Sequence, residues 1–125
     1  MTSSMVTATD LEVIIIEDAG EEGALVRLRG RLSIDTSPAF RDRLLALLRR
    51  QSPAAVIVDL TEVSYMDASG IATLVEGLKT ARNRQTTLRL KGLQGRVRHL
   101  FEVTGLLNLF ETNGGKSASS AVKVS

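Results

Sequence analysis

The sequence predicts an α/β domain in which helices cover a mixed β-sheet. Short runs of β-branched and aliphatic residues alternate along the chain with longer segments whose apolar residues recur at helical spacing. The chain has 125 residues, of which 43% are hydrophobic and 24% charged, which is typical of one globular domain with one sizeable core. The expected order of elements is strand, strand, helix, strand, helix, strand, helix, strand.

A β-hairpin opens the predicted domain. Residues 13–16 are β-branched and indicate a strand. The acidic segment 17–23 ends in glycine, which suits a turn. In residues 24–29 apolar side chains alternate with Arg27 and Arg29, so a second strand with one polar face should follow.

The first helix is expected to begin at Ser37-Pro38. Serine can accept hydrogen bonds from free backbone N–H groups, and proline is tolerated at the first helical position. The helix should end before Ser52-Pro53. Its apolar stripe consists of Phe40, Leu44, Leu47 and Leu48.

The middle of the chain predicts a buried strand followed by a helix. Residues 54–60 form a short β-branched run of the kind that is buried on both faces. Residues 61–66 are expected to be a connecting loop. Asp67-Ala68-Ser69-Gly70 then opens a helix that residues 81–84 close. The buried stripe of this helix is Ile71, Leu74, Val75 and Leu78.

The last third of the chain predicts a half-buried strand over residues 86–91 and a helix over residues 94–104. Gly105 follows as a helix stop. Residues 107–110 are expected to form a short final strand or an apolar plug. The stripe of the third helix is Val97, Leu100, Phe101 and Thr104.

The two ends of the chain differ in composition from its centre. Residues 1–11 are small and polar and are expected to be a flexible lead-in. Residues 112–125 are rich in glycine, serine and alanine and are expected to be a disordered tail. The folded domain should therefore span residues 12–111.

Composition excludes several function classes. The chain has no cysteine and one histidine, His99, so thiolate chemistry and a multi-histidine metal site are excluded, and no cofactor is expected. The net charge is only +2 and aromatic residues make up 3%, which argues against nucleic-acid binding. The sequence shows neither a secretory signal nor a membrane span, so a cytoplasmic protein without membrane insertion is expected.

Two enzyme motifs fail on spacing. A nucleophile elbow needs glycine two residues before and two residues after the serine, but those positions around Ser69 hold Asp67 and Ile71. Gly115-Lys116-Ser117 resembles the end of a phosphate-binding loop, but Phe110 stands where the first glycine is needed. We therefore expect no enzyme.

The start of the second predicted helix is the most informative segment. A helix N-terminus presents free N–H groups and a partial positive charge, which favours anions, including a phosphorylated serine. Asp67 or Ser69 can equally serve as a simple helix cap, with Gly70 permitting close packing. The pattern alone favours the cap.

Residues 56–75 resemble the central motif of STAS domains, the family of bacterial anti-sigma factor antagonists and sulphate-transporter C-terminal domains. They place Asp67-Ala68-Ser69-Gly70 after a buried strand and before an apolar helix. Gly30-Arg31-Leu32 resembles the family's early Gly-x-Leu/Ile element, and residues 90–110 resemble its last third. The resemblance implies a mixed sheet of four to five strands with helices mainly on one side.

The resemblance also implies a binding protein. Family members bind an anti-sigma factor, often one with serine-kinase activity, and so free a sigma factor and regulate transcription indirectly. The alternative is a STAS subunit of a lipid or solute ABC transporter. The oligomeric state stays open. The implied partner-binding residues are Ser33, Ile34, Ser64, Tyr65, Met66, Asp67, Ala68, Ser69 and Gly70.

Two departures from the family pattern bear on phosphorylation. The family acceptor, usually serine or threonine, directly follows the motif aspartate, and that position here is Ala68, which has no hydroxyl. Ser69 is the alternative acceptor. The early element commonly carries an acid where this chain has Ser33. The sequence therefore predicts a protein that is not switched off by phosphorylation at position 68, unless Ser69 has taken over.

Overall fold

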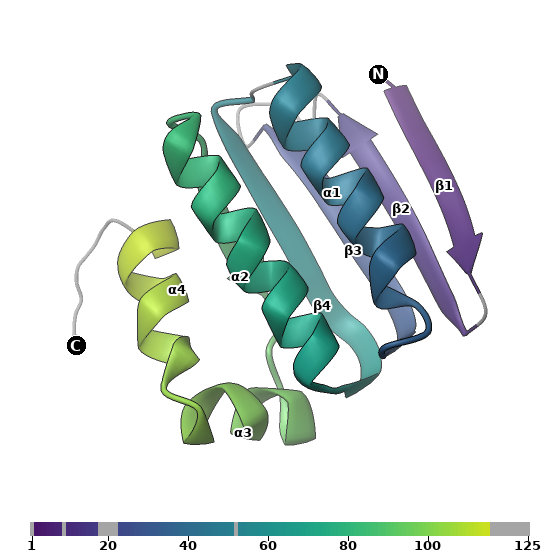
Figure 1. The fold of residues 1–125 in the computed structure, drawn as a ribbon, viewed down its shortest axis with the longest axis vertical. Coiled ribbons are helices and arrows are strands. Elements are labelled where there is room, and N and C mark those ends of the chain that lie inside the picture. The colour runs from purple at the N-terminus through teal and green to yellow at the C-terminus, as the bar shows by residue number, and fades with distance from the viewer. Residues whose placement is uncertain (1, 9, 18–22, 52, 116–125) are drawn as a thin grey trace.

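In the part of the chain that the structure describes, five strands form a single mixed sheet in which neighbours in sequence are neighbours in space (Figure 1). The computed structural model describes residues 2–8, 10–17, 23–51 and 53–115. The pairs β1–β2 and β2–β3 are antiparallel, and the pairs β3–β4 and β4–β5 are parallel. The strands are β1 (Thr2–Ala8), β2 (Leu11–Glu17), β3 (Ala24–Leu32), β4 (Ala55–Met66) and β5 (Thr87–Lys91).

The helices gather mainly on one face of this sheet. Helices α1 (Ser37–Gln51) and α2 (Ala68–Asn83) lie side by side in front of the strands in Figure 1. Helix α3 (Gly95–Val103) lies across the end of the sheet where α2 begins, and α4 (Leu106–Gly115) packs against β5. The α/β class and the one-sided mixed sheet expected from the sequence are confirmed.

The core lies between the sheet and its helical layer. Alternate residues of β2 (Leu11, Val13 and Ile15) face this core and are at most 2% exposed. The predicted α1 stripe is buried throughout, and from the α2 stripe Leu74 and Leu78 are buried while Ile71 and Val75 are partly buried. Burial of each large aliphatic or aromatic side chain stabilises the fold by about 1.5–3 kcal/mol, so these stripes hold the two helices to the sheet.

The N-terminal segment corrects one expectation. Residues 2–8 are not a loose lead-in but form β1, which pairs with β2 from Thr2↔Glu17 to Ala8↔Leu11. Backbone hydrogen bonds to a neighbouring strand hold this segment, and they need no apolar side-chain pattern that a sequence would reveal.

The end of β4 corrects a second expectation. Residues 61–66, expected as a loop, continue the strand, with Val63 and Met66 buried and the residues between them exposed. The register of β4 against β3 shifts between Arg27 and Arg29 and again between Gly30 and Arg31. These irregularities disturb the strict alternation by which a strand is recognised in sequence.

The C-terminal segment corrects a third expectation. Residues 107–110, expected as a strand or plug, belong to α4, whose Phe110 is 3% exposed and packs edge-to-face on Phe101 with ring centroids 5.8 Å apart. The expected disordered tail begins too early, because residues 112–115 are helical. The rest of that expected tail, residues 116–125, lies outside the described residues.

Candidate functional site

The carboxylate of Asp67 accepts the hydrogen bonds that hold the start of α2. Asp67 is the N-cap residue, with extended backbone angles (φ −115°, ψ −171°). Its Oδ1 accepts hydrogen bonds from the backbone N–H of Ser69 at 2.9 Å, the N–H of Gly70 at 3.4 Å and the Ser69 hydroxyl at 2.5 Å. These bonds satisfy donors that the first turn of a helix otherwise leaves free, so the capping role considered from the sequence is confirmed.

The other carboxylate oxygen ties α2 to the loop between β3 and α1. Asp67 Oδ2 accepts from the backbone N–H of Ile34 at 3.1 Å, and the backbone N–H of Asp67 donates to the Leu32 carbonyl at 3.2 Å. The loop is itself held by Thr36, whose buried hydroxyl accepts from the Ser33 N–H at 2.9 Å and donates to the Arg31 carbonyl at 2.7 Å. Segments more than thirty residues apart therefore form one fixed surface.

The hydrogen bonds to Asp67 stabilise its ionised form. The pKa of Asp67 is lowered, chiefly by the hydroxyl of Ser69 and then by the backbone N–H groups of Ile34, Gly70 and Ser69, while burial opposes the shift. Asp67 is therefore a structural anion at neutral pH.

This anion predicts a pH dependence of stability. Since the folded state lowers the pKa of Asp67, the unfolded state binds more protons in acid, and stability falls as the pH drops below about 4 through the folded-state pKa. We expect Asp67→Asn, which keeps a capping oxygen, to be less stable than the wild type at pH 7, with the difference shrinking toward pH 3. Urea denaturation across this range measures it. Asp42→Asn, at an exposed α1 position, is the control, and a difference that grows in acid would contradict the assignment.

The two residues that follow Asp67 differ in accessibility. Ala68 is exposed at the first helical position and presents only a methyl group. Ser69 is half-buried, and its hydroxyl lies 2.5 Å from Asp67 Oδ1 and 3.0 Å from the hydroxyl of buried Ser37. The Ser69 hydroxyl thus already has two partners inside the capping network.

Gly70 is buried where α2 meets the ends of β3 and β4. A Cβ atom at this position would lie 2.8 Å from Met66 Cγ and 2.9 Å from Leu32 Cγ. Real Cβ atoms essentially never come so close to other heavy atoms. Gly70 therefore lets the first turn of α2 approach the sheet, which is the close packing considered from the sequence.

The end of β4 contributes the remaining predicted residues. Ser64 and Tyr65 are exposed, and the Arg31 guanidinium lies over the Tyr65 ring at 4.2 Å from its centroid. Met66 is only 7% exposed and belongs mainly to the core. The structure thus brings the expected site residues to one end of the sheet, with Met66 and Gly70 beneath its surface.

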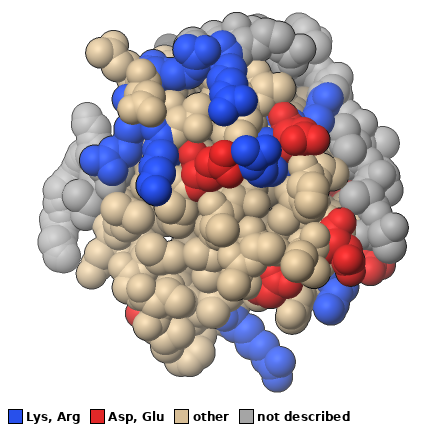
Figure 2. Space-filling view, in the orientation of Figure 1, with Lys and Arg blue, Asp and Glu red and all other residues tan. Residues whose placement is uncertain are grey.

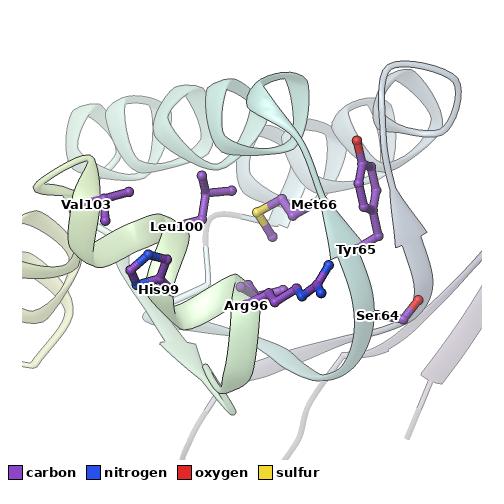
Figure 3. Close-up of a pocket in the computed structure, with 8 residues that line it drawn as sticks. Ser64, Tyr65, Met66, Arg96, His99, Leu100 and Val103 are labelled. Carbon is purple, nitrogen blue, oxygen red and sulfur yellow. The ribbon is translucent and has the colours of Figure 1, made fainter.

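A groove of about 390 Å³ adjoins this surface between the end of β4 and α3 (Figure 3). Ser64, Tyr65 and Met66 form one wall. The other wall, on α3, consists of residues that sequence reasoning did not assign to the site: Arg96, Val97, His99, Leu100 and Val103.

The spacing of residues in the sequence could have indicated the groove wall on α3. Arg96, Leu100 and Val103 recur at helical spacing beside the core residues Val97 and Phe101, which marks a second face of α3. Thr104, expected on the core stripe, is exposed instead. Helix α3 therefore faces the core with one side and the groove with another.

Neither a cluster of metal-ligating side chains nor a membrane-spanning helix is found in the part of the chain that the structure describes. Within it, no three histidine, cysteine, aspartate or glutamate side chains gather as a metal site would require. None of its helices combines the length and the apolar character that crossing a membrane demands.

Comparisons with known proteins agree with this geometry. A family profile described as "Mlab, STAS domain" matches residues 16–111. The anti-sigma-B factor antagonist of Listeria monocytogenes is 38% identical over 82 residues, which cover 66% of this chain and 71% of that protein. The anti-sigma-B factor antagonist of Staphylococcus aureus is 33% identical over 90 residues, covering 72% of this chain and 82% of that protein.

Solved structures share the fold at lower sequence identity. An anti-sigma factor antagonist from Mycobacterium paratuberculosis superposes with a TM-score of 0.68 at 20% identity, covering 84% of this chain and 87% of that chain. The Bacillus cell fate determinant SpoIIAA in its phosphorylated form gives a TM-score of 0.59 at 16% identity, covering 84% and 85%. The family profile and the curated relatives together carry the assignment: the chain belongs to the STAS domain family.

Proposed function

We propose that this protein is an anti-sigma factor antagonist, a cytoplasmic binding protein rather than an enzyme. It binds an anti-sigma factor, which has serine-kinase activity in some cases, and so frees a sigma factor for transcription. The names of the relatives that are 33–38% identical to this chain support this function over the transporter-subunit alternative.

The observation that carries the proposal is the placement of exposed apolar side chains. Among the described residues, the large hydrophobic side chains that are well exposed are Ile34 (72%), Tyr65 (40%) and Val103 (64%). Ile34 and Tyr65 belong to the surface around Asp67, which consists of the loop between β3 and α1, the end of β4 and the start of α2. Val103 belongs to the adjoining groove. Apolar side chains held in water by a rigid framework are typical of protein-binding surfaces.

The charge distribution also favours the end of the molecule where α2 begins as the surface that binds a partner. In Figure 2 basic side chains gather at the opposite end, over the C-terminal ends of α1 and α2, where Arg84 donates to the Arg49 carbonyl at 2.8 Å. Toward the other end of the molecule that view shows more uncharged surface, and the charged side chains of α3 are the exposed Arg96, Arg98 and Glu102. Interface cores are depleted of charged residues, so this end suits a protein partner better.

Binding to the anti-sigma factors of the source organism tests the proposal. We expect isothermal titration calorimetry to show binding to one of them, and we expect Ile34→Asp to weaken it at least tenfold, because a carboxylate would replace an exposed apolar contact. Asn108→Asp adds the same charge on exposed α4 and should change the affinity less than twofold. Binding to an ABC transporter ATPase and to no anti-sigma factor would favour the transporter alternative.

Phosphorylation is the second test. A phosphate on the acceptor position would present about −1.5 to −2 charges to the partner. Ala68 cannot carry it, and the Ser69 hydroxyl is held by Asp67 and Ser37. We therefore expect the wild-type protein to stay unmodified and competent to bind when incubated with a kinase-type anti-sigma factor and ATP.

Intact-protein mass spectrometry reads out this test on the wild type, Ala68→Ser and Ser69→Ala. Ala68→Ser is expected to gain one phosphate and to lose its partner, which also shows that the kinase is active. If the wild type gains a phosphate that Ser69→Ala lacks, and releases its partner as a result, Ser69 has taken over the acceptor role and the permanently competent form is excluded.

A further inference from the structure

The groove between β4 and α3 has an apolar floor open to solvent. Met66 and Leu100 point into it from opposite walls, and Val103 lies at its rim on α3 (Figure 3). Val103 is 64% exposed and so offers an apolar contact at this rim. A volume of about 390 Å³ accommodates one or two large side chains of a partner.

The charged groups at the groove are basic. Arg96 reaches from α3 across the groove toward β4 (Figure 3), and exposed Arg31 lies over the Tyr65 ring on the opposite wall. Within the described residues, neither guanidinium forms an ion pair with a carboxylate, whereas Arg98 on the same helix pairs with Glu102 at 3.2 Å. None of the described residues that line the groove is an aspartate or a glutamate.

We propose that this groove binds an acidic, amphipathic segment of a protein partner, with an apolar side chain between Met66 and Leu100 and a carboxylate on Arg96. The inference rests on the proposed function, since it adds a second contact to the same interface. Tyr65 belongs both to the surface around Asp67 and to the groove wall, and Met66 lies beneath that surface and lines the groove, so the two contacts are continuous.

Arginine suits this role because its planar fork pairs with a carboxylate through two hydrogen bonds. A second copy of this chain is a poorer occupant. Two such basic grooves facing each other would bring unpaired guanidinium groups together, and like charges at an interface weaken it.

Two peptides and three protein variants test the groove. The probes are a fourteen-residue helical peptide with leucine at positions spaced three and four apart and glutamate elsewhere, and the same peptide with lysine in place of glutamate. Backbone amide chemical shifts measured by NMR report where each peptide binds. The variants are Arg96→Glu, Val103→Asp and, as the matched control, Arg98→Glu on the same helix outside the groove.

The acidic peptide is expected to shift the amide signals of residues 64–66 and 96–103, with an affinity at least tenfold higher than that of the lysine peptide. Arg96→Glu and Val103→Asp should each reduce this affinity at least tenfold, and Arg98→Glu less than twofold. Equal affinity for both peptides, or shifts confined to other residues, would overturn the proposal.

Calorimetry with the anti-sigma factor separates this inference from the proposed function. If the wild type and Arg96→Glu bind that partner equally well while Ile34→Asp does not bind, the function stands and the groove assignment fails. If no anti-sigma factor binds the wild type but the acidic peptide occupies the groove as described, the proposed function fails and the groove assignment stands.

Discussion

Gly70→Leu is expected to destabilise the domain by about 3 kcal/mol or more, at the upper end of the range for overpacked cores. The Cβ atom alone would lie 2.8 Å from Met66 Cγ and 2.9 Å from Leu32 Cγ. Leucine adds three further carbons to a place already filled by the core. The first turn of α2 would have to move away from the sheet, and the Asp67 hydrogen bonds would move with it. Urea denaturation measures the change in free energy of unfolding.

Ala72→Leu is the matched control for this prediction. Ala72 is exposed on the same helix, so its replacement should change the free energy of unfolding by no more than about 0.5 kcal/mol. Gly70→Leu is also expected to bind the anti-sigma factor poorly even at temperatures where it is folded. Near-normal stability together with full binding would show that Gly70 plays no part in the site.

Phe101→Ala is expected to cost about 3–5 kcal/mol, the usual range for removing a buried phenylalanine. Phe101 is fully buried and packs edge-to-face on Phe110, so it joins α3 to α4 as well as to the core. The same helix carries one wall of the groove on its other side. Removal of the Phe101 side chain should therefore weaken the packing of α3 on the core and also disturb the groove wall that α3 carries.

Thermal unfolding and peptide binding together check the second prediction. Val103→Ala, on the exposed side of the same helix, should leave the free energy of unfolding within about 0.5 kcal/mol of the wild type. A Phe101→Ala protein that unfolds at the wild-type temperature would show that α3 is held by other contacts, and that the groove does not depend on this anchor.

Periodicity explains which elements the sequence predicts well. Helices α1 and α2 were predicted because their apolar stripes face a single core, and their ends carry the signals of Ser37-Pro38 and Asp67. The strand β1 and the last residues of β4 were not predicted, because pairing with a neighbouring strand holds them. Register shifts also disturb the alternation of β4. The short apolar run 107–110 suits either a strand or a helix, and packing against Phe101 decides for α4.

The candidate site likewise has features that the sequence predicts and features that depend on how the elements pack. The sequence predicts a helix cap at Asp67 or Ser69, and it shows the missing hydroxyl at Ala68 and the small residue at Gly70, because helix capping, side-chain chemistry and side-chain size act within a few residues of the chain. Which distant groups complete the site follows from the packing of the fold. The bond from the Ile34 N–H to Asp67 spans thirty-three positions, and the groove exists because α3 packs beside the end of β4. Both depend on how whole elements pack, and no local pattern of residues encodes that packing.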